Sequence, residues 1–177
     1  MSNNDFTRLS SFITKHFGIK MPPAKKVMLQ SRLQKRLREL NIASYKDYID
    51  FLFSKQGMQD ELIHMVDVVT TNKTDFFREP NHFEFLTSFV LPEIMNKKSF
   101  QYQVKIWSAG CSSGEEPYTI AIVLSEFREK MPHTDFYILG TDISSRILEK
   151  AALSIYPEQR IEGIPMALKK KYFLRSK

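Results

Sequence analysis

Residues 107–118 read WSAGCSSGEEPY, a run of small residues that joins a predicted strand to a predicted helix. Apolar and polar residues alternate over 102–108, which predicts the strand, and apolar residues at helical spacing over 117–129 predict the helix. A short apolar run at 136–139 predicts a second, buried strand, and a helix is expected over 144–152. This order of strand, helix, strand and helix predicts a βαβα unit with a parallel sheet.

The loop after the first strand and the residues after the second strand predict a ligand site. A glycine turn that opens a helix lets a ligand approach the backbone, where N–H groups and the helix dipole face it. Asp142 follows the second strand, and an acid there can accept both ribose hydroxyls of a nucleoside. Because only Gly110 and Gly114 of the loop are glycine, the spacing is not the dinucleotide motif GxGxxG. The pattern favours an adenosine-type cofactor, and a purely structural glycine turn is the alternative.

The residues before this unit predict a small all-helical domain. Apolar residues at spacings of three and four over 5–17 predict an amphipathic helix that stops at Gly18. After two prolines, the pattern over 24–40 predicts a second helix whose basic residues lie mostly opposite its apolar face. Ser44 can cap a third helix, and a fourth is expected to begin near Gln59.

The composition is that of an ordinary soluble globular protein, with 177 residues of which 42% are hydrophobic and 26% charged. The single cysteine excludes an internal disulfide and a cysteine-rich zinc site, and the histidines show no metal-ligand spacing, so no metal is expected. No apolar run approaches the roughly 20 residues that a membrane span needs. The first residues, MSNND, lack the features of a secretory signal. We therefore expect a cytoplasmic protein without membrane insertion.

The net charge of +6 favours an anionic partner. Basic residues without any acid among them cluster in the second predicted helix, at Lys25, Lys26, Arg32, Lys35, Arg36 and Arg38. An ordinary solvated helix face is the alternative interpretation of this cluster. Nucleic-acid binding is disfavoured, because the sequence contains no evident helix-turn-helix or base-stacking motif.

Three separated motifs carry a family resemblance. They read TTNKTDFFR at 70–78, WSAGCSSGEEPYT at 107–119 and GTDIS at 140–144. In this order they resemble the CheR family, S-adenosylmethionine-dependent methyltransferases that esterify glutamates on bacterial chemotaxis receptors. The resemblance extends from the helical N-terminus to KYF at 171–173 and covers nearly the whole chain.

The resemblance implies an α + α/β fold class, in which a small helical domain precedes the start of a Rossmann-like methyltransferase domain. We expect the helical domain at 1–71, a linker segment and helix at 72–100 with Pro80 near the first turn of that helix, and a partial Rossmann-like domain with two strands at 101–177. Members of this family continue well past the point where this sequence ends. We therefore expect a C-terminally truncated chain with at most a weakened cofactor half-site.

The resemblance also implies the residues of an S-adenosylmethionine site. Position by position, these residues are Asn72, Thr74, Arg78, Ala109, Gly110, Gly114, Glu116 and Asp142. Glu116 would lie beside the methionine end of the cofactor, and Asp142 would hold the ribose. Arg78, the one catalytic residue that we expect, would pair with either the cofactor carboxylate or the substrate glutamate. No general acid or base is needed, because the glutamate is already ionised at pH 7 and the leaving group is a neutral thioether.

Each charged residue of this set has a structural alternative. Glu116 could form a capping box with Ser113 at the start of the helix, and Asp142 could cap the helix that follows it. Arg78 could belong to a surface salt bridge. Which of Glu115 and Glu116 faces the ligand stays open.

The remaining conspicuous side chains are expected to be structural. Phe76 and Phe77 are predicted core residues, and Cys111 is predicted to be a small buried residue rather than a nucleophile. The hypothesis for function is a protein-glutamate O-methyltransferase, a monomer that docks on the acidic surface of chemotaxis receptors through the basic helix at 24–40. The alternative is a non-catalytic module that docks on the receptor while its catalytic remnant is idle.

Overall fold

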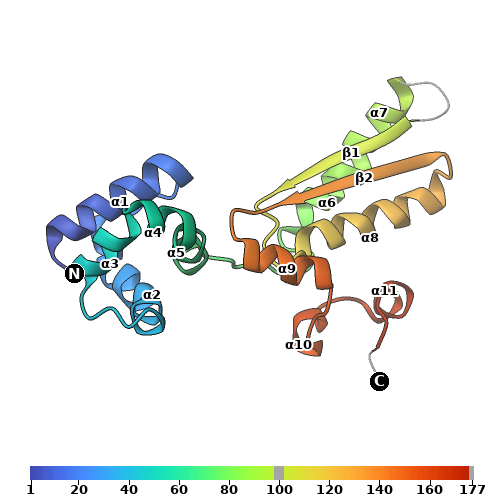
Figure 1. Cartoon of the computed structure of the whole chain (residues 1–177). Coiled ribbons are helices and arrows are strands. Elements are labelled where there is room, and N and C mark those ends of the chain that lie inside the picture. The colour runs from blue at the N-terminus through green and yellow to red at the C-terminus, as the bar shows by residue number, and fades with distance from the viewer. Residues whose placement is uncertain (98–101, 176–177) are drawn as a thin grey trace. The chain divides into compact units, whose positions relative to one another are not determined.

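The computed structural model describes residues 1–97 and 102–175, and it divides the chain into two compact units (Figure 1). The helical unit comprises Met1–Thr71 together with Ile143–Ser145, and the sheet unit comprises Asn72–Asp142 and Arg146–Lys177. The predicted boundary between the linker helix and the Rossmann-like segment, at residue 100, lies outside the described residues.

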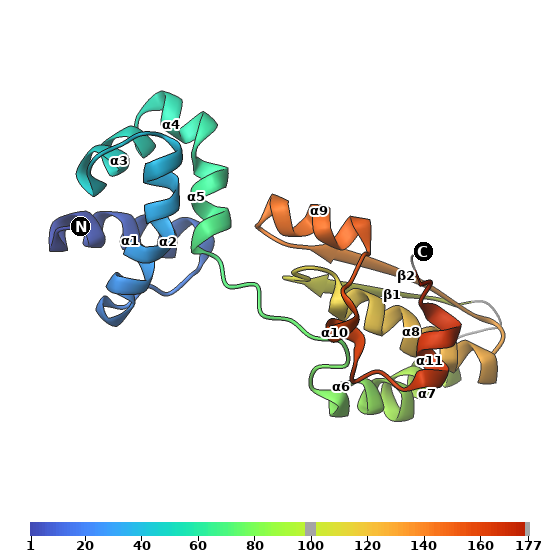
Figure 2. The same cartoon turned by 90° about the horizontal axis from the view of Figure 1, so that it is seen from below.

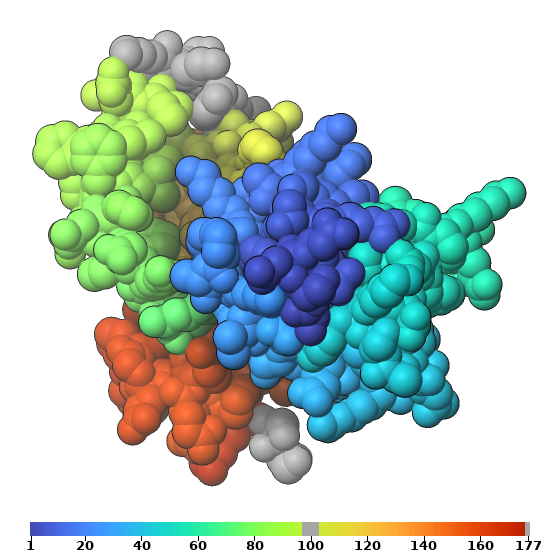
Figure 3. All heavy atoms as spheres, turned by 90° about the vertical axis from the view of Figure 1, so that its left-hand side faces the viewer, coloured from blue at the N-terminus to red at the C-terminus, as the bar shows by residue number. Residues whose placement is uncertain are grey.

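The helical unit consists of short helices that enclose one apolar core. Its elements are α1 (Asn3–Phe17), the 3-10 turn η1 (Pro23–Lys25), α2 (Lys26–Glu39), α3 (Tyr45–Leu52), α4 (Lys55–Asp60) and α5 (Leu62–Val69). Their buried side chains form one cluster, whose fully enclosed members include Leu9, Ile13, Leu29, Leu33, Tyr48, Leu52 and Met65. Figure 3 shows one outer face of this unit, whose atoms are coloured blue to cyan.

The first helix ends at the residue that its sequence predicts, but it begins at Asn3, two residues before the predicted start. The hydroxyl of Ser2 accepts a hydrogen bond from the backbone N–H of Asp5 at 3.1 Å, and the Asp5 carboxylate accepts the N–H of Ser2 at 3.0 Å. This capping box satisfies N–H groups that have no partner within the helix. Gly18 ends the helix in the left-handed region at φ +69°, which confirms the predicted glycine stop. Ser44 likewise caps α3, as predicted.

The prediction of a single fourth helix beginning near Gln59 is wrong. Ser54 caps a short helix, α4, and the chain turns at Glu61 before α5 begins. A Cβ added at Gly57 would lie 2.0 Å from the carbonyl oxygen of Phe51, so only glycine allows α4 to approach the end of α3 so closely. The unit therefore contains five α-helices among its described residues rather than four.

The break between α4 and α5 places a carboxylate in the core. Glu61 is 2% exposed and accepts hydrogen bonds from Arg36 Nε at 2.9 Å, Arg36 Nη2 at 2.6 Å and the Tyr48 hydroxyl at 2.9 Å. The ion pair raises the pKa of Arg36, and burial raises the pKa of Tyr48, so one stays charged and the other stays a hydroxyl donor. A buried carboxylate is tolerated because it has a cation and hydrogen-bond donors around it.

The sheet unit contains a two-stranded parallel sheet, as the sequence predicts. Its elements are α6 (Pro80–Phe85), the π-helical turn η2 (Leu86–Val90), α7 (Leu91–Lys97), β1 (Tyr102–Ala109), α8 (Glu115–Lys130), β2 (Thr134–Thr141), α9 (Ser145–Leu153), α10 (Glu158–Ile161) and α11 (Met166–Tyr172). The strands pair in parallel with Val104 opposite Phe136 and Ile106 opposite Ile138. Pro80 stands in the first turn of α6, as predicted.

One face of this sheet carries the core of the unit. Successive side chains of a strand point to opposite faces, so Val104 and Ile106 lie on the same face and pack with residues of α6, η2, α7 and α8. Figure 2 shows these helices on one side of the two strands. The opposite face carries Trp107, Tyr137 and Leu139, which are 67%, 54% and 47% exposed. The carboxyl ends of β1 and β2 lie side by side, and the loop after β1 leads directly into the N-terminus of α8.

Candidate functional site

A cavity of about 640 Å³ lies in the sheet unit beside the carboxyl half of β1. Its lining includes four of the predicted site residues, Thr74, Arg78, Gly110 and Glu116. The other four predicted residues, Asn72, Ala109, Gly114 and Asp142, are not part of the lining. Four parts of the chain meet at the cavity: the linker before α6, the α6 helix with the start of η2, the end of β1 with the loop after it, and the N-terminal part of α8.

Gly110 provides an open stretch of backbone at the cavity. It adopts φ +79°, a conformation that L side chains rarely take, and an added Cβ would meet no atom within 4 Å. The N–H groups of Gly110 and Cys111 both donate to the carbonyl oxygen of Thr141, at 2.7 and 2.9 Å. These bonds fix the loop against the end of β2, and the space beside Gly110 allows a ligand to approach the backbone.

Gly114 has a different role from Gly110. It caps the N-terminus of α8 at φ +96°, and an added Cβ would lie 2.7 Å from the hydroxyl oxygen of Tyr156 and 2.9 Å from the ring of Tyr118. The Tyr156 hydroxyl donates to the carbonyl oxygen of Ser113 at 2.7 Å. Glycine is required at 114 because these two tyrosines pack against the backbone of the loop.

The two neighbouring glutamates at the start of α8 point to different surroundings. Glu115 is 1% exposed and binds Arg160 at 2.5 Å and the Ser113 hydroxyl at 2.6 Å. Glu116 is exposed, lines the cavity and accepts a hydrogen bond from the Ser108 hydroxyl at 2.7 Å. The capping box between Ser113 and Glu116 is wrong, because the Ser113 hydroxyl bonds to Glu115 and no side chain caps α8.

The linker carries Thr74, which is 8% exposed, and Arg78, which is exposed. Arg78 Nη1 donates to the carbonyl oxygen of Lys73 at 3.1 Å, and within the described ranges this guanidinium forms no ion pair, so a surface salt bridge does not account for it. Phe77 and Glu79 adopt positive φ angles of 54° and 55°. Non-glycine residues in this region carry strain, and such strain clusters at functional sites.

The linker backbone is tied to the loop and to α8 by hydrogen bonds. The N–H of Phe77 donates to the Thr119 hydroxyl at 3.1 Å, and the Ser112 hydroxyl donates to the carbonyl oxygen of Asn72 at 3.2 Å. Thr119 is fully buried and in turn donates to the carbonyl oxygen of Glu115 at 2.6 Å. The strained linker is therefore held in one conformation against the start of α8.

Asp142 and Cys111 support the loop. One carboxylate oxygen of Asp142 accepts the N–H of Ser112 at 2.9 Å, which holds Ser112 at φ +50°. Cys111 is 2% exposed, as predicted for a small buried residue, and burial raises the pKa of its thiol. A raised pKa keeps the thiol protonated at neutral pH, so Cys111 is not an activated nucleophile.

The structure also places unpredicted residues at the cavity. Lys73 and Asp75 lie within the linker motif, and Lys105 and Trp107 alternate with buried residues of β1. The period of two along the strand would have placed Lys105 and Trp107 on one face from the sequence alone. Arg160, by contrast, reaches Glu115 from 45 positions away in the chain, and no local pattern could have found it.

Within residues 1–97 and 102–175, no group of three or more His, Cys, Asp and Glu side chains could hold a metal ion. None of the helices that they form is long and apolar enough to cross a membrane.

A cavity at the carboxyl end of a parallel strand, beside a glycine loop that opens a helix, is the nucleotide-binding position of Rossmann-like folds. Fold and site thus define a Rossmann-like ligand-binding domain preceded by a helical domain. Residues 4–70 match the family described as CheR methyltransferase, all-alpha domain, and residues 72–177 match CheR methyltransferase, SAM binding domain. The chain belongs to the CheR methyltransferase family.

Curated relatives match almost the whole chain. It is 41% identical over 175 residues to a chemotaxis protein methyltransferase of Borreliella burgdorferi, and the matched region covers 97% of this chain and 62% of that protein. It is 36% identical to a probable chemotaxis protein methyltransferase of Rhizobium etli, with 88% and 58% covered. It is 34% identical to chemotaxis protein methyltransferase 2 of Pseudomonas aeruginosa, with 98% and 59% covered. The chain thus spans about three fifths of the length of these relatives.

The match to the SAM binding domain identifies S-adenosylmethionine as the cofactor, and the cavity residues fit its charges. S-adenosylmethionine carries an ammonium, a carboxylate and a sulfonium. Glu116 offers a carboxylate with one hydrogen bond, from Ser108, in the described part of the chain, and Arg78 offers a guanidinium. The open backbone at Gly110 leaves room for close approach.

Proposed function

We propose that this chain provides the receptor-docking and cofactor-binding parts of an enzyme that methylates glutamate side chains of chemotaxis receptors. The observation that carries the proposal is the set of opposite charges, Arg78 and Glu116, that lines one cavity beside the open backbone of Gly110. The amino-acid end of the cofactor carries an ammonium and a carboxylate, which pair with an anionic and a cationic side chain respectively. No specific observation favours the non-catalytic alternative.

We propose the domain limits and the site residues that the family resemblance implies. The helical domain is residues 1–71, the linker begins at Asn72, and residues 101–177 form the partial Rossmann-like domain. The cofactor site consists of Asn72, Thr74, Arg78, Ala109, Gly110, Gly114, Glu116 and Asp142.

The described side chains support a mechanism of binding and orientation. When bound, S-adenosylmethionine supplies an electrophilic methyl group next to a sulfonium. Glu116, in the lining of the cavity, would hold the ammonium group of the cofactor, and Arg78 would hold a carboxylate of the cofactor or of the substrate glutamate. Asp142 supports the loop through the N–H of Ser112 and offers an acid at the end of β2 for the ribose. Catalysis then depends on positioning the ionised glutamate in line, without proton transfer.

The cofactor part of the proposal is tested by calorimetric titration of this chain with S-adenosylhomocysteine. Binding by the chain and its loss in Asp142→Ala would support the site. A folded chain that does not bind the product would refute cofactor binding by these residues. Transfer of a radiolabelled methyl group to a receptor cytoplasmic fragment then tests the activity, with Arg78→Gln expected to abolish transfer.

We propose that receptor docking uses a smaller basic surface than the cluster at 24–40 suggests. Arg32 donates to the carbonyl oxygens of Val69 and Thr70 at 2.6 and 2.9 Å and so caps the end of α5. Arg36 binds the buried Glu61. The exposed cations that remain on α2 include Arg38, whose side chain has no ion pair within the described ranges.

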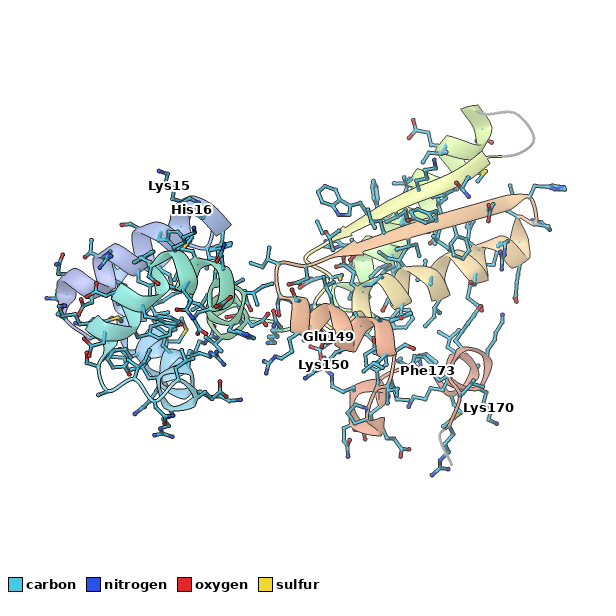
Figure 4. The ribbon with its side chains drawn as sticks, viewed as in Figure 1. Lys15, His16, Glu149, Lys150, Lys170 and Phe173 are labelled. Atoms are coloured by element: carbon cyan, nitrogen blue, oxygen red, sulfur yellow. The ribbon has the colours of Figure 1, made fainter. Side chains whose placement is uncertain are left out.

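The docking proposal is tested by reversing the charge of Arg38 with Arg38→Glu. Lys15→Glu is the matched control, because Lys15 is also exposed and lies at the end of α1 (Figure 4). Binding to an acidic receptor fragment should weaken in Arg38→Glu but not in Lys15→Glu, and it should weaken steeply with salt, because salt screens exposed charges. Equal binding of the two variants would refute docking through α2. We further propose that the chain acts as a monomer and binds no nucleic acid.

A further inference from the structure

Arg160 connects two segments of the sheet unit that are far apart in the sequence. It lies in the short helix α10, and its Nη2 donates to the carbonyl oxygen of Thr74 and to Glu115 Oε1, both at 2.5 Å. Its Nη1 donates to Asp75 Oδ1 at 3.0 Å. One planar guanidinium therefore holds the linker and the first turn of α8 at the same time, a geometry that suits the fork of arginine donors.

The chain on either side of Arg160 makes contacts with the same two segments. Tyr156 donates to the Ser113 carbonyl oxygen at 2.7 Å, and burial raises the pKa of its hydroxyl, which keeps it a donor. The ring of Phe76, in the linker, packs edge-on against the rings of Tyr156 and Phe173, with centroids 4.9 and 5.4 Å apart. Figure 4 shows Phe173 between α10 and α11. Tyr156, Arg160 and Phe173 thus contact the linker and the start of α8 from outside the cavity lining.

The two segments that Arg160 joins carry the charged groups of the cavity. Thr74 and Asp75 line it from the linker together with Arg78, and Glu116 lines it from α8, directly after Glu115. We propose that Arg160 is a positioning residue, which sets the linker against the start of α8 so that both sides of the cavity can bind the cofactor together. This inference rests on the proposed cofactor site.

A purely structural role for Arg160 would be to neutralise the buried carboxylate of Glu115. Glu115 is 1% exposed, whereas Arg160 is 37% exposed. Removal of the arginine alone would leave an uncompensated buried charge and would destabilise the unit whatever its effect on the cavity. The two roles separate when Glu115 also loses its charge, because the contacts of Arg160 with Thr74 and Asp75 do not depend on that charge.

The experiment therefore compares Glu115→Gln, Arg160→Gln and the double variant in the full chain. Dissociation constants for S-adenosylhomocysteine are measured by calorimetry, and melting temperatures by circular dichroism. The double variant should melt near Glu115→Gln but bind about tenfold more weakly, since small displacements of binding groups have effects of this size or larger. Equal affinity of the double variant and Glu115→Gln would show that Arg160 only neutralises Glu115 and would overturn the proposal. Lys171→Gln is the matched control, because Lys171 joins α11 to α8 through Glu126, outside the cavity lining.

Hydrogen exchange of the ligand-free chain provides a readout that does not depend on the cofactor. Relative to Glu115→Gln, the double variant should exchange faster in peptides covering 72–79 and 111–117, while peptides of the helical unit stay unchanged. Unchanged exchange at 72–79 would overturn the positioning role. If the unmodified chain does not bind S-adenosylhomocysteine, the proposed function fails, whereas the exchange result still decides whether Arg160 holds the two segments together.

Discussion

Replacement of Glu116 by Gln is the most direct test of the cavity chemistry. The amide keeps the size of the side chain and can still accept the hydrogen bond from Ser108, which is 2.7 Å long in the structure. It removes the negative charge that would bind an ammonium group. Hydrogen bonds to charged groups contribute about 1.5–3 kcal/mol. Since about 1.4 kcal/mol corresponds to a factor of ten, the dissociation constant for S-adenosylhomocysteine should rise about 10- to 100-fold.

The assay is calorimetric titration of the full chain with S-adenosylhomocysteine, with the melting temperature as a measure of folding. Glu116 is exposed, so Glu116→Gln should melt like the unmodified chain. Glu129→Gln is the control, because Glu129 is also an exposed glutamate of α8 but lies outside the cavity lining. An affinity of Glu116→Gln equal to that of Glu129→Gln would refute the assignment of Glu116 to the ligand.

Three further outcomes are expected. Arg36→Leu should lower the free energy of unfolding by about 3–5 kcal/mol because it leaves the Glu61 carboxylate buried without its cation, and urea unfolding should show most of this loss recovered when Glu61→Met is added. Gly114→Ala should cost about 1–3 kcal/mol, since its Cβ would lie 2.7 Å from a tyrosine oxygen; Gly18→Ala, also at a positive φ (+69° against +96°) but in open space, should cost less in the same assay. The raised pKa of Cys111 should displace the pH profile of its reaction with a thiol reagent to higher pH in the folded chain than in urea, and identical profiles would contradict the burial argument.

Elements whose start and stop residues are local could be predicted from the sequence. The end of α1 is predicted from Gly18, whereas its start, two residues before the predicted one, is set by the capping box of Ser2 and Asp5. The parallel pairing of β1 and β2 follows from two apolar segments separated by one helix. The break between α4 and α5 is not predicted, and Glu61 at this break binds Arg36, a partner 25 residues earlier in the chain that no local pattern indicates. The apolar pattern alone reads as one continuous helix.

The same distinction applies to the candidate site. Two of the motifs that carry the family resemblance, at 70–78 and 107–119, contain Thr74, Arg78, Gly110 and Glu116. The structure places all four residues in the cavity lining. The contacts that hold these motifs together join distant positions: Arg160 to Glu115, and Thr119 to Phe77 across 42 residues. A single sequence carries no signal for such pairs, since any arginine or threonine of the chain could have made them.

The distant contacts hold strained backbone in place around the cavity. Phe77, Glu79 and Ser112 all adopt positive φ angles without being glycine, and each such residue costs about 1–3 kcal/mol. This strain persists only because the surroundings oppose it: Thr119 accepts the N–H of Phe77, and Asp142 accepts the N–H of Ser112. Without these contacts the linker is expected to relax to unstrained φ angles, and Arg78 and Glu116 would then lose their arrangement at the cavity. The contacts of Thr119, Asp142 and Arg160 therefore hold the binding groups in place before a ligand binds. Fewer groups then need to be ordered on binding, which lowers the entropic cost of binding.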